Sequence, residues 1–213
     1  SARKYYVLET SIAPAGRSAW HELMRTDSLL ADFEALFEHA QAFLEIFPED
    51  PLGHARLGVA AVETRRFDQA LPALERAVKF LADREELWEY LARAYLRTGA
   101  PDKAQQLGAK PEVYRVAKIY AEFREGQNAD LCLERLPESP DPYVLWTRGR
   151  ILFLSQRRDQ ALSLLARAAD AQPRYAEAVG DYHHSAGRAD KAAYYWNVAK
   201  VAASRSAAAK LHP

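Results

Sequence analysis

The sequence predicts an all-α protein built from repeated helical hairpins, and three observations support this fold class. Small residues recur along the chain, and an alanine follows each of them after twelve positions. Apolar residues recur with helical spacing around these pairs, and glycine and proline separate the segments. No strand-like alternation competes in this region. The five pairs are Gly58/Ala70, Ala92/Ala104, Ala117/Ala129, Gly149/Ala161 and Gly180/Ala192.

The composition is that of a soluble globular protein. Lysine and arginine total 29, as do aspartate and glutamate, so the chain has no excess positive charge for a nucleic-acid backbone. A single cysteine, Cys132, excludes an internal disulfide and a multi-cysteine zinc site. No apolar run approaches the roughly 18 residues of a membrane span, so we expect no membrane insertion. The sequence does not distinguish a cytoplasmic from a periplasmic protein.

The first fifty residues precede the repeats. Residues 1–16 fit no hairpin, and we expect an extended N-terminal arm. Residues 17–50 resemble a degenerate hairpin, whose first helix is predicted over Ser18–Met24 with Ser18 as its N-cap. An amphipathic pattern over residues 28–47, ending before Pro48, predicts the second helix.

The repeat array is predicted over residues 51–200, followed by a helix end and tail over residues 201–213. Turns are predicted at Gly99, Gly126 and Gly187, because glycine adopts a positive φ after a helix end at little cost. Gly108 and Pro111 should limit the second helix of the second hairpin to about two turns from Pro101, and we expect the array to change curvature there.

The small residues predict close contacts between helices, since a large side chain at either position would hold the helix axes apart. Large residues four positions after the alanine should fill the adjacent layer. These residues are Leu74, Leu133, Leu165 and Trp196.

The second unit contains Trp88, Leu91, Ala92, Tyr95 and Ala104, and the fourth contains Gly149, Ala161, Ala168 and Pro173. This pattern resembles the tetratricopeptide repeat (TPR) over residues 51 to about 200. The resemblance implies a right-handed α-α superhelix of about five hairpins plus the degenerate N-terminal one. It also implies that the first helices line a concave groove that binds a protein or peptide.

In such arrays the residue after each small position, and the residue three before it, face the groove. We therefore predict a partner-binding site with cations and exposed aromatic side chains, which are frequent interface anchors. Its predicted residues are Glu89, Arg93, Tyr114, Lys118, Trp146 and Arg150. Alternatively, Arg93 and Arg150 pair with acids on adjacent helices, and Trp146 packs between hairpins.

No motif indicates an enzyme, and we predict no catalytic, cofactor or metal site. The sequence lacks a P-loop, a Gly-x-Gly-x-x-Gly fingerprint and a His-Glu-x-x-His motif. His183 and His184 are adjacent on a predicted helix, so their side chains point about 100° apart and cannot share a metal. We expect His183 to have a packing or surface role and Cys132 to be a buried or half-buried structural thiol.

The sequence therefore predicts a scaffold or adaptor for a partner with a carboxylate and an apolar side chain, in a bacterial assembly or secretion system. The inward row lacks the asparagines of TPR modules that hold chaperone tails, so that role is disfavoured. Two alternatives stay open. One is a regulatory or substrate-docking domain of a larger enzyme, which the non-methionine start at Ser1 favours. The other is a self-assembling homo-oligomer, favoured by an alanine-rich C-terminus without a polar cap.

Overall fold

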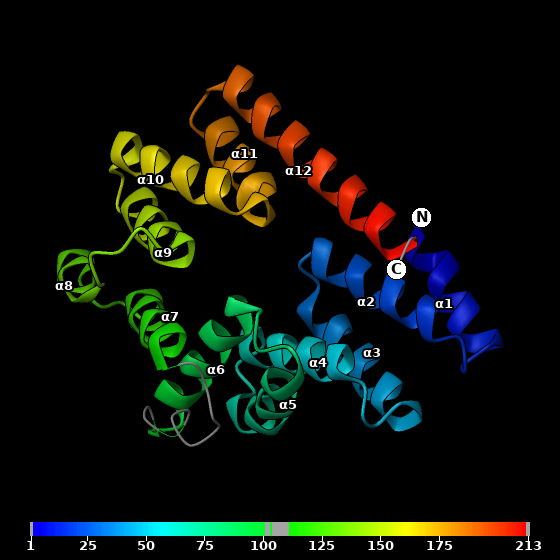
Figure 1. Ribbon diagram of the computed structural model, residues 1–213. Helices are drawn as coiled ribbons and strands as arrows, with labels where there is room; N and C mark the ends of the chain where they lie inside the picture. The colour runs from blue at the N-terminus through cyan, green and yellow to red at the C-terminus, as the bar shows by residue number, and fades with distance from the viewer. Residues whose placement is uncertain (1, 101–102, 104–110, 212–213) are drawn as a thin grey trace. The chain divides into compact units, whose positions relative to one another are not determined.

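The computed structural model describes residues 2–100, 103 and 111–211, and these residues form helices joined by short turns (Figure 1). Within these ranges there is no β-strand, which confirms the all-α prediction. The helices are α1 (Ala2–Ile12), α2 (Arg17–Leu29), α3 (Phe33–Ile46), α4 (Pro51–Glu63), α5 (Phe67–Phe80), α6 (Glu85–Arg97), α7 (Pro111–Arg124), α8 (Ala129–Arg135), α9 (Pro142–Leu154), α10 (Arg158–Ala171), the 3-10 turn η2 (Pro173–Tyr175), α11 (Ala176–Ser185) and α12 (Ala189–Leu211).

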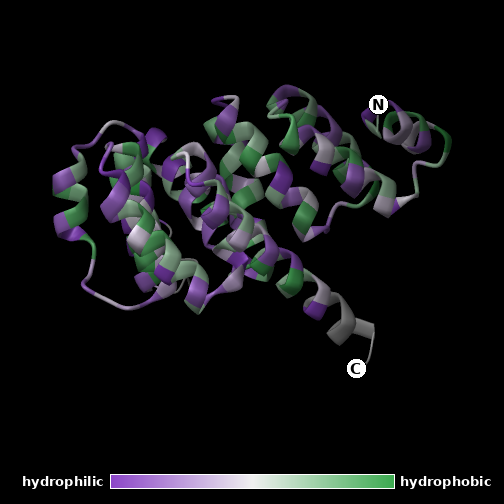
Figure 2. Ribbon diagram, turned by 90° about the horizontal axis from the view of Figure 1, so that it is seen from above, coloured by the Kyte–Doolittle hydropathy of each residue, from purple (hydrophilic) through white to green (hydrophobic). Residues whose placement is uncertain are grey.

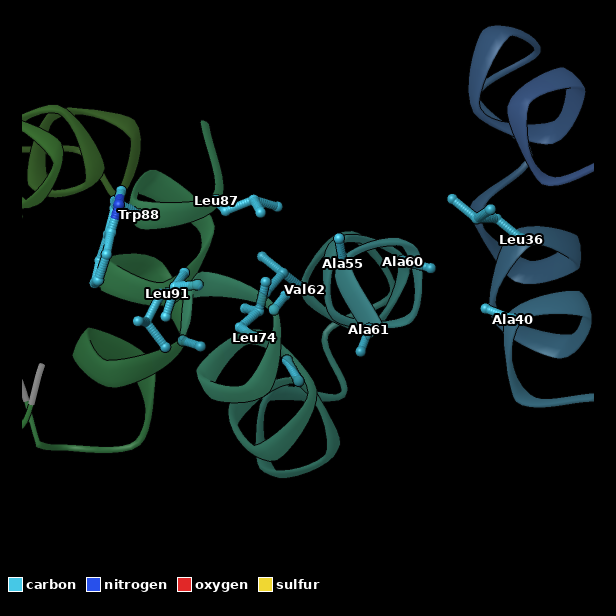
Figure 3. Close-up of a cluster of buried hydrophobic side chains, with 14 of the residues drawn as sticks. Leu36, Ala40, Ala55, Ala60, Ala61, Val62, Leu74, Leu87, Trp88 and Leu91 are labelled. Carbon is cyan, nitrogen blue, oxygen red and sulfur yellow. The ribbon is translucent and has the colours of Figure 1, made fainter. Parts of the chain in front are cut away.

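The chain divides into two compact units, residues 1–121 and 122–213, and the division falls inside α7. In the N-terminal unit, Figure 3 shows Val62, Leu74 and Leu91 converging from α4, α5 and α6. The C-terminal unit has its own core, which includes Leu145, Leu165 and Tyr195. Hydrophobic and hydrophilic segments alternate along the helices, as amphipathic packing requires (Figure 2).

The glycines of the predicted pairs lie at close helix contacts. A Cβ atom added to Gly58 would lie 2.5 Å from Leu74 Cγ, and one added to Gly149 would lie 2.6 Å from Leu165 Cγ. Gly180 is similar, since its added Cβ would lie 2.4 Å from Trp196 Cδ1. In each case the large residue is sixteen positions after the glycine. The predicted close helix contacts at these glycines are confirmed, but Leu74, Leu165 and Trp196 pack directly against them and not in an adjacent layer.

The same backbone turn follows the first helix of each hairpin, that is, α2, α4, α6, α7, α9 and α11. The second residue after the first helix has a positive φ, and the next N–H donates to the carbonyl five residues earlier. This is the Schellman motif, which satisfies carbonyl groups left open at a helix end. The positive-φ residues are Ala31, Arg65, Gly99, Gly126, Gln156 and Gly187, so the three predicted glycine turns are confirmed.

Replacing Arg65 by glycine should stabilise the N-terminal unit. Arg65 has a φ of 63° and an exposed side chain. A non-glycine residue in this left-handed region carries a strain of about 1–2 kcal/mol, part of which is offset by the greater chain entropy of unfolded glycine. We expect Arg65→Gly to raise the free energy of unfolding by about 0.5–1 kcal/mol in urea titrations.

The reverse substitution, Gly99→Ala, is the matched control. Its new Cβ would meet nothing within 4 Å, so only the backbone conformation at a φ of 74° changes. It should destabilise the protein by a similar amount. If both variants shifted stability in the same direction, the assignment of strain to these turns would be wrong.

The third hairpin departs from the predicted spacing. In the other hairpins the small residue lies seven positions before the positive-φ residue, as Gly58 does before Arg65, whereas Ala117 lies nine positions before Gly126. The residue equivalent to Gly58 is therefore Ile119. Ala129 is only the first residue of the seven-residue α8, so Ala117 and Ala129 are not an equivalent pair, and that prediction is wrong.

The N-terminal predictions are also corrected. Residues 2–12 are helix α1 and not an extended arm. The segment 28–47 is not one helix, because α2 continues to Leu29 and the chain then turns at Ala31, which has a φ of 53°. Gly16 and not Ser18 is the N-cap of α2, and it makes no side-chain cap. Asp32 caps α3, accepting a hydrogen bond from Ala35 N at 3.2 Å.

Two helices begin with an aspartate followed by a proline. Asp50 precedes Pro51 and accepts a hydrogen bond from Gly53 N at 2.8 Å, and Asp141 precedes Pro142 and accepts one from Tyr143 N at 2.9 Å. Proline is favoured at the first helical position because its missing N–H is not needed there. The predicted short helix starting at Pro101 lies outside the described residues, so it stays a prediction together with the expected change of curvature.

A buried ion cluster fastens α1 to the rest of its unit. Asp27 of α2 is fully buried, and its carboxylate contacts Arg3 Nε at 2.9 Å and His39 Nδ1 at 2.7 Å. Arg3 also reaches Asp32 Oδ2 at 3.0 Å. The Arg3–Asp27 contact is an ion pair by distance, although its angle falls outside hydrogen-bond geometry. Because a buried carboxylate needs a partner, these contacts explain why α1 is docked.

Candidate functional site

An aromatic cluster lies between α9 and α11 in the C-terminal unit. The Trp146 ring stacks on Tyr175 with centroids 4.9 Å apart and meets Tyr182 edge-on at 5.9 Å. Phe153 meets the same Tyr182 at 4.6 Å. Tyr175 is buried, whereas Trp146, Phe153 and Tyr182 are half-buried, so the cluster presents aromatic surface at the first helices of two consecutive hairpins.

Guanidinium groups lie over these rings. The Cζ atoms of Arg150, Arg158 and Arg174 lie 5.4, 5.9 and 5.0 Å from the centroids of Trp146, Phe153 and Tyr175, respectively. These distances fall within the range of cation–π attraction. Arg174 also donates to the Tyr175 hydroxyl at 3.1 Å. The cluster therefore combines apolar area with positive charge.

Two of the predicted site residues, Trp146 and Arg150, belong to this cluster. Trp146 is not a freely exposed anchor, because it packs against the next hairpin as the alternative predicts. The sequence interpretation missed Phe153, Tyr175 and Tyr182. Phe153 lies seven residues after Trp146, and Tyr182 lies seven after Tyr175, so a search for aromatic residues on one helix face would have found them.

The predicted residues of the N-terminal unit lie in different environments. Arg93 forms an ion pair with Glu63 of α4 at 2.9 Å, which is the pairing that the alternative predicts. It also lies 5.9 Å from the ring of Tyr90, and burial together with the Glu63 carboxylate raises the pKa of that tyrosine. Lys118 is half-buried on α7.

Tyr114 and Glu89 do not present binding surface. Tyr114 is only 3% exposed and packs edge-on against Trp88 at 6.5 Å, so the prediction of an exposed aromatic is wrong. Glu89 is 7% exposed. The indole of Trp88 lies between α6 and α7 and packs against the Tyr114 ring. This contact buries the ring in the core.

The residues considered for chemistry have packing roles. His183 is buried and stacks on Tyr195 at 5.4 Å, and burial lowers its pKa. Cys132 is buried, and burial raises the pKa of its thiol. Across the described part of the chain, no three histidine, cysteine, aspartate or glutamate side chains are grouped to hold a metal.

The sequence profile of the family described as "Tetratricopeptide repeat" matches residues 61–109. The match runs from the end of α4 past α6, and the same hairpin turn recurs at each described first helix from α2 to α11. Residues 61–109 therefore match the tetratricopeptide repeat. No curated protein matches the sequence of this repeat protein.

Several solved structures are similar to this chain at low sequence identity. TTC0263, a thermophilic TPR protein from Thermus thermophilus, shares 19% identity over 86% of this chain and 90% of its own, with a TM-score of 0.43. YrrB, described as a TPR protein with an unusual peptide-binding site, shares 16% identity over 79% of this chain and 92% of its own, with a TM-score of 0.45. MamA from Desulfovibrio magneticus RS-1 shares 12% identity over 88% of this chain and 96% of its own, with a TM-score of 0.37.

Membrane insertion finds no support in the helices that the structure describes. Not one of them combines the length and the apolar character that crossing a bilayer requires.

Proposed function

We propose that this repeat protein is an interaction scaffold that binds a partner peptide through the aromatic cluster of its C-terminal unit. The supporting observation is the arrangement of Trp146, Phe153 and Tyr182 on neighbouring first helices, with Arg150 above the indole. Aromatic and arginine side chains carry much of the binding energy at protein interfaces. This chemistry supports a binding role.

The cluster suits a peptide that carries a carboxylate beside an apolar side chain. The apolar side chain would pack on Trp146 and Tyr182, and Arg150 would donate charge-assisted hydrogen bonds to the carboxylate. By analogy with TPR proteins, we place this scaffold in a bacterial assembly or secretion system.

The test is selection from a random dodecapeptide library on wild-type protein, followed by titration of the enriched peptides by fluorescence anisotropy. We expect the enriched peptides to contain an acidic residue next to an aromatic or branched apolar one. Arg150→Glu should weaken their binding at least tenfold, because it replaces an attraction by a repulsion at a partly desolvated site.

Arg167→Glu is the matched control, because it makes the same charge change at an exposed position of α10 in the same unit. It should bind as the wild type does, and both variants should keep the wild-type circular dichroism. If the Arg150→Glu variant bound the peptides as tightly as the wild type, the aromatic cluster would not be the binding site. If no peptide were enriched, the alternatives of self-assembly or a regulatory domain would be favoured instead.

A further inference from the structure

Arg56 of α4 is a half-buried arginine with unused donors. Its Nη1 donates to Ser28 Oγ at 3.5 Å, the limit of a hydrogen bond. Its Nε is shielded from solvent and finds no hydrogen-bond partner among the described residues. A guanidinium has five N–H donors, and leaving one buried and unsatisfied is unfavourable, so the site lacks an acceptor.

Two further arginines lie near Arg56. The Ser28 contact places Arg56 beside the last turn of α2, and Arg25 lies three residues before Ser28 on that helix. Arg84 is the N-cap of α6, which packs against α4. The side chains of Arg25 and Arg84 are 60% and 49% exposed, so both can move towards a ligand.

The nearby acids are already engaged. Glu22 pairs with Arg25 at 2.8 Å, and Asp27 is held by Arg3 and His39. Burial lowers the pKa of the Arg56 guanidinium, and the charges of Arg84 and Arg25 lower it further, against the opposing effect of Glu22 and Asp27. The cluster therefore keeps an uncompensated positive charge.

We propose that Arg25, Arg56 and Arg84 bind a dianionic phosphate group between α2, α4 and α6. Guanidinium groups bind phosphate oxygens with paired hydrogen bonds, and the Ser28 hydroxyl offers one more donor. Glu22 pairs with Arg25, and Glu86 lies 3.9 Å from Arg84, so the three guanidinium groups keep one net positive charge. Phosphate suits them better than a single carboxylate does, because it offers more acceptor oxygens for paired hydrogen bonds. The phosphate is either free or carried by a phosphorylated partner. This site lies in the N-terminal unit, so it does not depend on the peptide cluster around Trp146.

The test is a titration of the full chain at pH 7.5 with inorganic phosphate, O-phosphoserine or acetate, at constant ionic strength. The readout is the Nε–Hε resonance of Arg56 in ¹H–¹⁵N spectra, because this group is the buried donor. We expect both phosphates to shift the resonance with saturation at millimolar concentration and acetate to bind at least tenfold more weakly. Tighter binding of O-phosphoserine than of inorganic phosphate would indicate a phosphate carried by a partner. Tighter binding of inorganic phosphate would indicate a free phosphate ion.

Variants separate this site from general salt effects. Phosphate stabilises many proteins by exclusion from their surface, so the rise in melting temperature is compared between Arg56→Gln and Arg76→Gln. Arg76 is exposed on α5 in the same unit. Arg76→Gln should keep the full wild-type rise, and Arg56→Gln should lose the saturable part while staying folded. An unmoved Arg56 resonance, equal binding of acetate, or an equal rise in both variants would overturn the proposal.

Discussion

Gly149→Ala should lower the free energy of unfolding of the C-terminal unit by about 1–3 kcal/mol, as overpacking of a well-filled contact does. The new methyl group would lie 2.6 Å from Leu165 Cγ and 3.3 Å from the backbone oxygen of Ala161. Leu165 is fully buried, so it has no space to move into, and the helices α9 and α10 must separate. Urea unfolding followed by circular dichroism measures the loss.

Two companion variants test the cause. Gly180→Ala should be closer to neutral, because its clash is with Trp196, which is 39% exposed and can turn away. The double variant Gly149→Ala, Leu165→Ala should be at least about 1 kcal/mol more stable than the sum of the single losses predicts, since the smaller residue makes room for the methyl group. Equal losses at the two glycines, or an additive double variant, would contradict this account.

Arg3→Met should undock α1 while leaving the remaining helices folded. The substitution leaves the buried Asp27 carboxylate in contact with His39 but without its arginine, and it removes the link to Asp32. Breaking a fully buried ion pair costs about 3–5 kcal/mol, and because Arg3 is 31% exposed we expect about 2–3 kcal/mol here. Hydrogen exchange of the α1 amides should accelerate about 30-fold or more.

Two controls accompany this variant. Lys4→Met changes an exposed cation of the same helix and should leave exchange of α1 close to that of the wild type. Arg3→Met combined with Asp27→Leu should recover much of the lost protection, because no unpaired buried carboxylate is left. Failure of the double variant to recover would mean that α1 is held by apolar contacts, such as those of Tyr6, and not by the ion cluster.

The hairpins that begin with α4, α9 and α11 could be predicted from the sequence, because each combines a helical apolar period with a glycine that a large neighbour requires. Gly58 and Leu74 show this directly. The turn at Ala31 could not be predicted, since alanine gives no signal for a positive φ, and the neighbouring contacts hold it there. The third hairpin was misaligned because Ala117 is small and buried without being the residue that faces the next helix.

The candidate site was predictable only in part. Spacing identified Trp146 and Arg150 on the correct helix, yet their contacts depend on Tyr175 and Tyr182 of the next hairpin. Position in the repeat says which way a residue points and does not say how large its neighbours are. Tyr114 shows the difference, because Trp88 opposite it decides that the ring is buried.

The division between the two compact units has a practical consequence for dissecting the molecule. It falls between Ala121 and Glu122, inside the continuous helix α7. A protease needs an extended stretch of backbone, and a helix does not offer one until it unwinds. Cutting the gene at this point would leave one fragment ending and the other beginning on incomplete helical turns. Recombinant halves should therefore share the whole of α7, each carrying residues 111–124, if they are to retain the structure that each unit has in the intact chain.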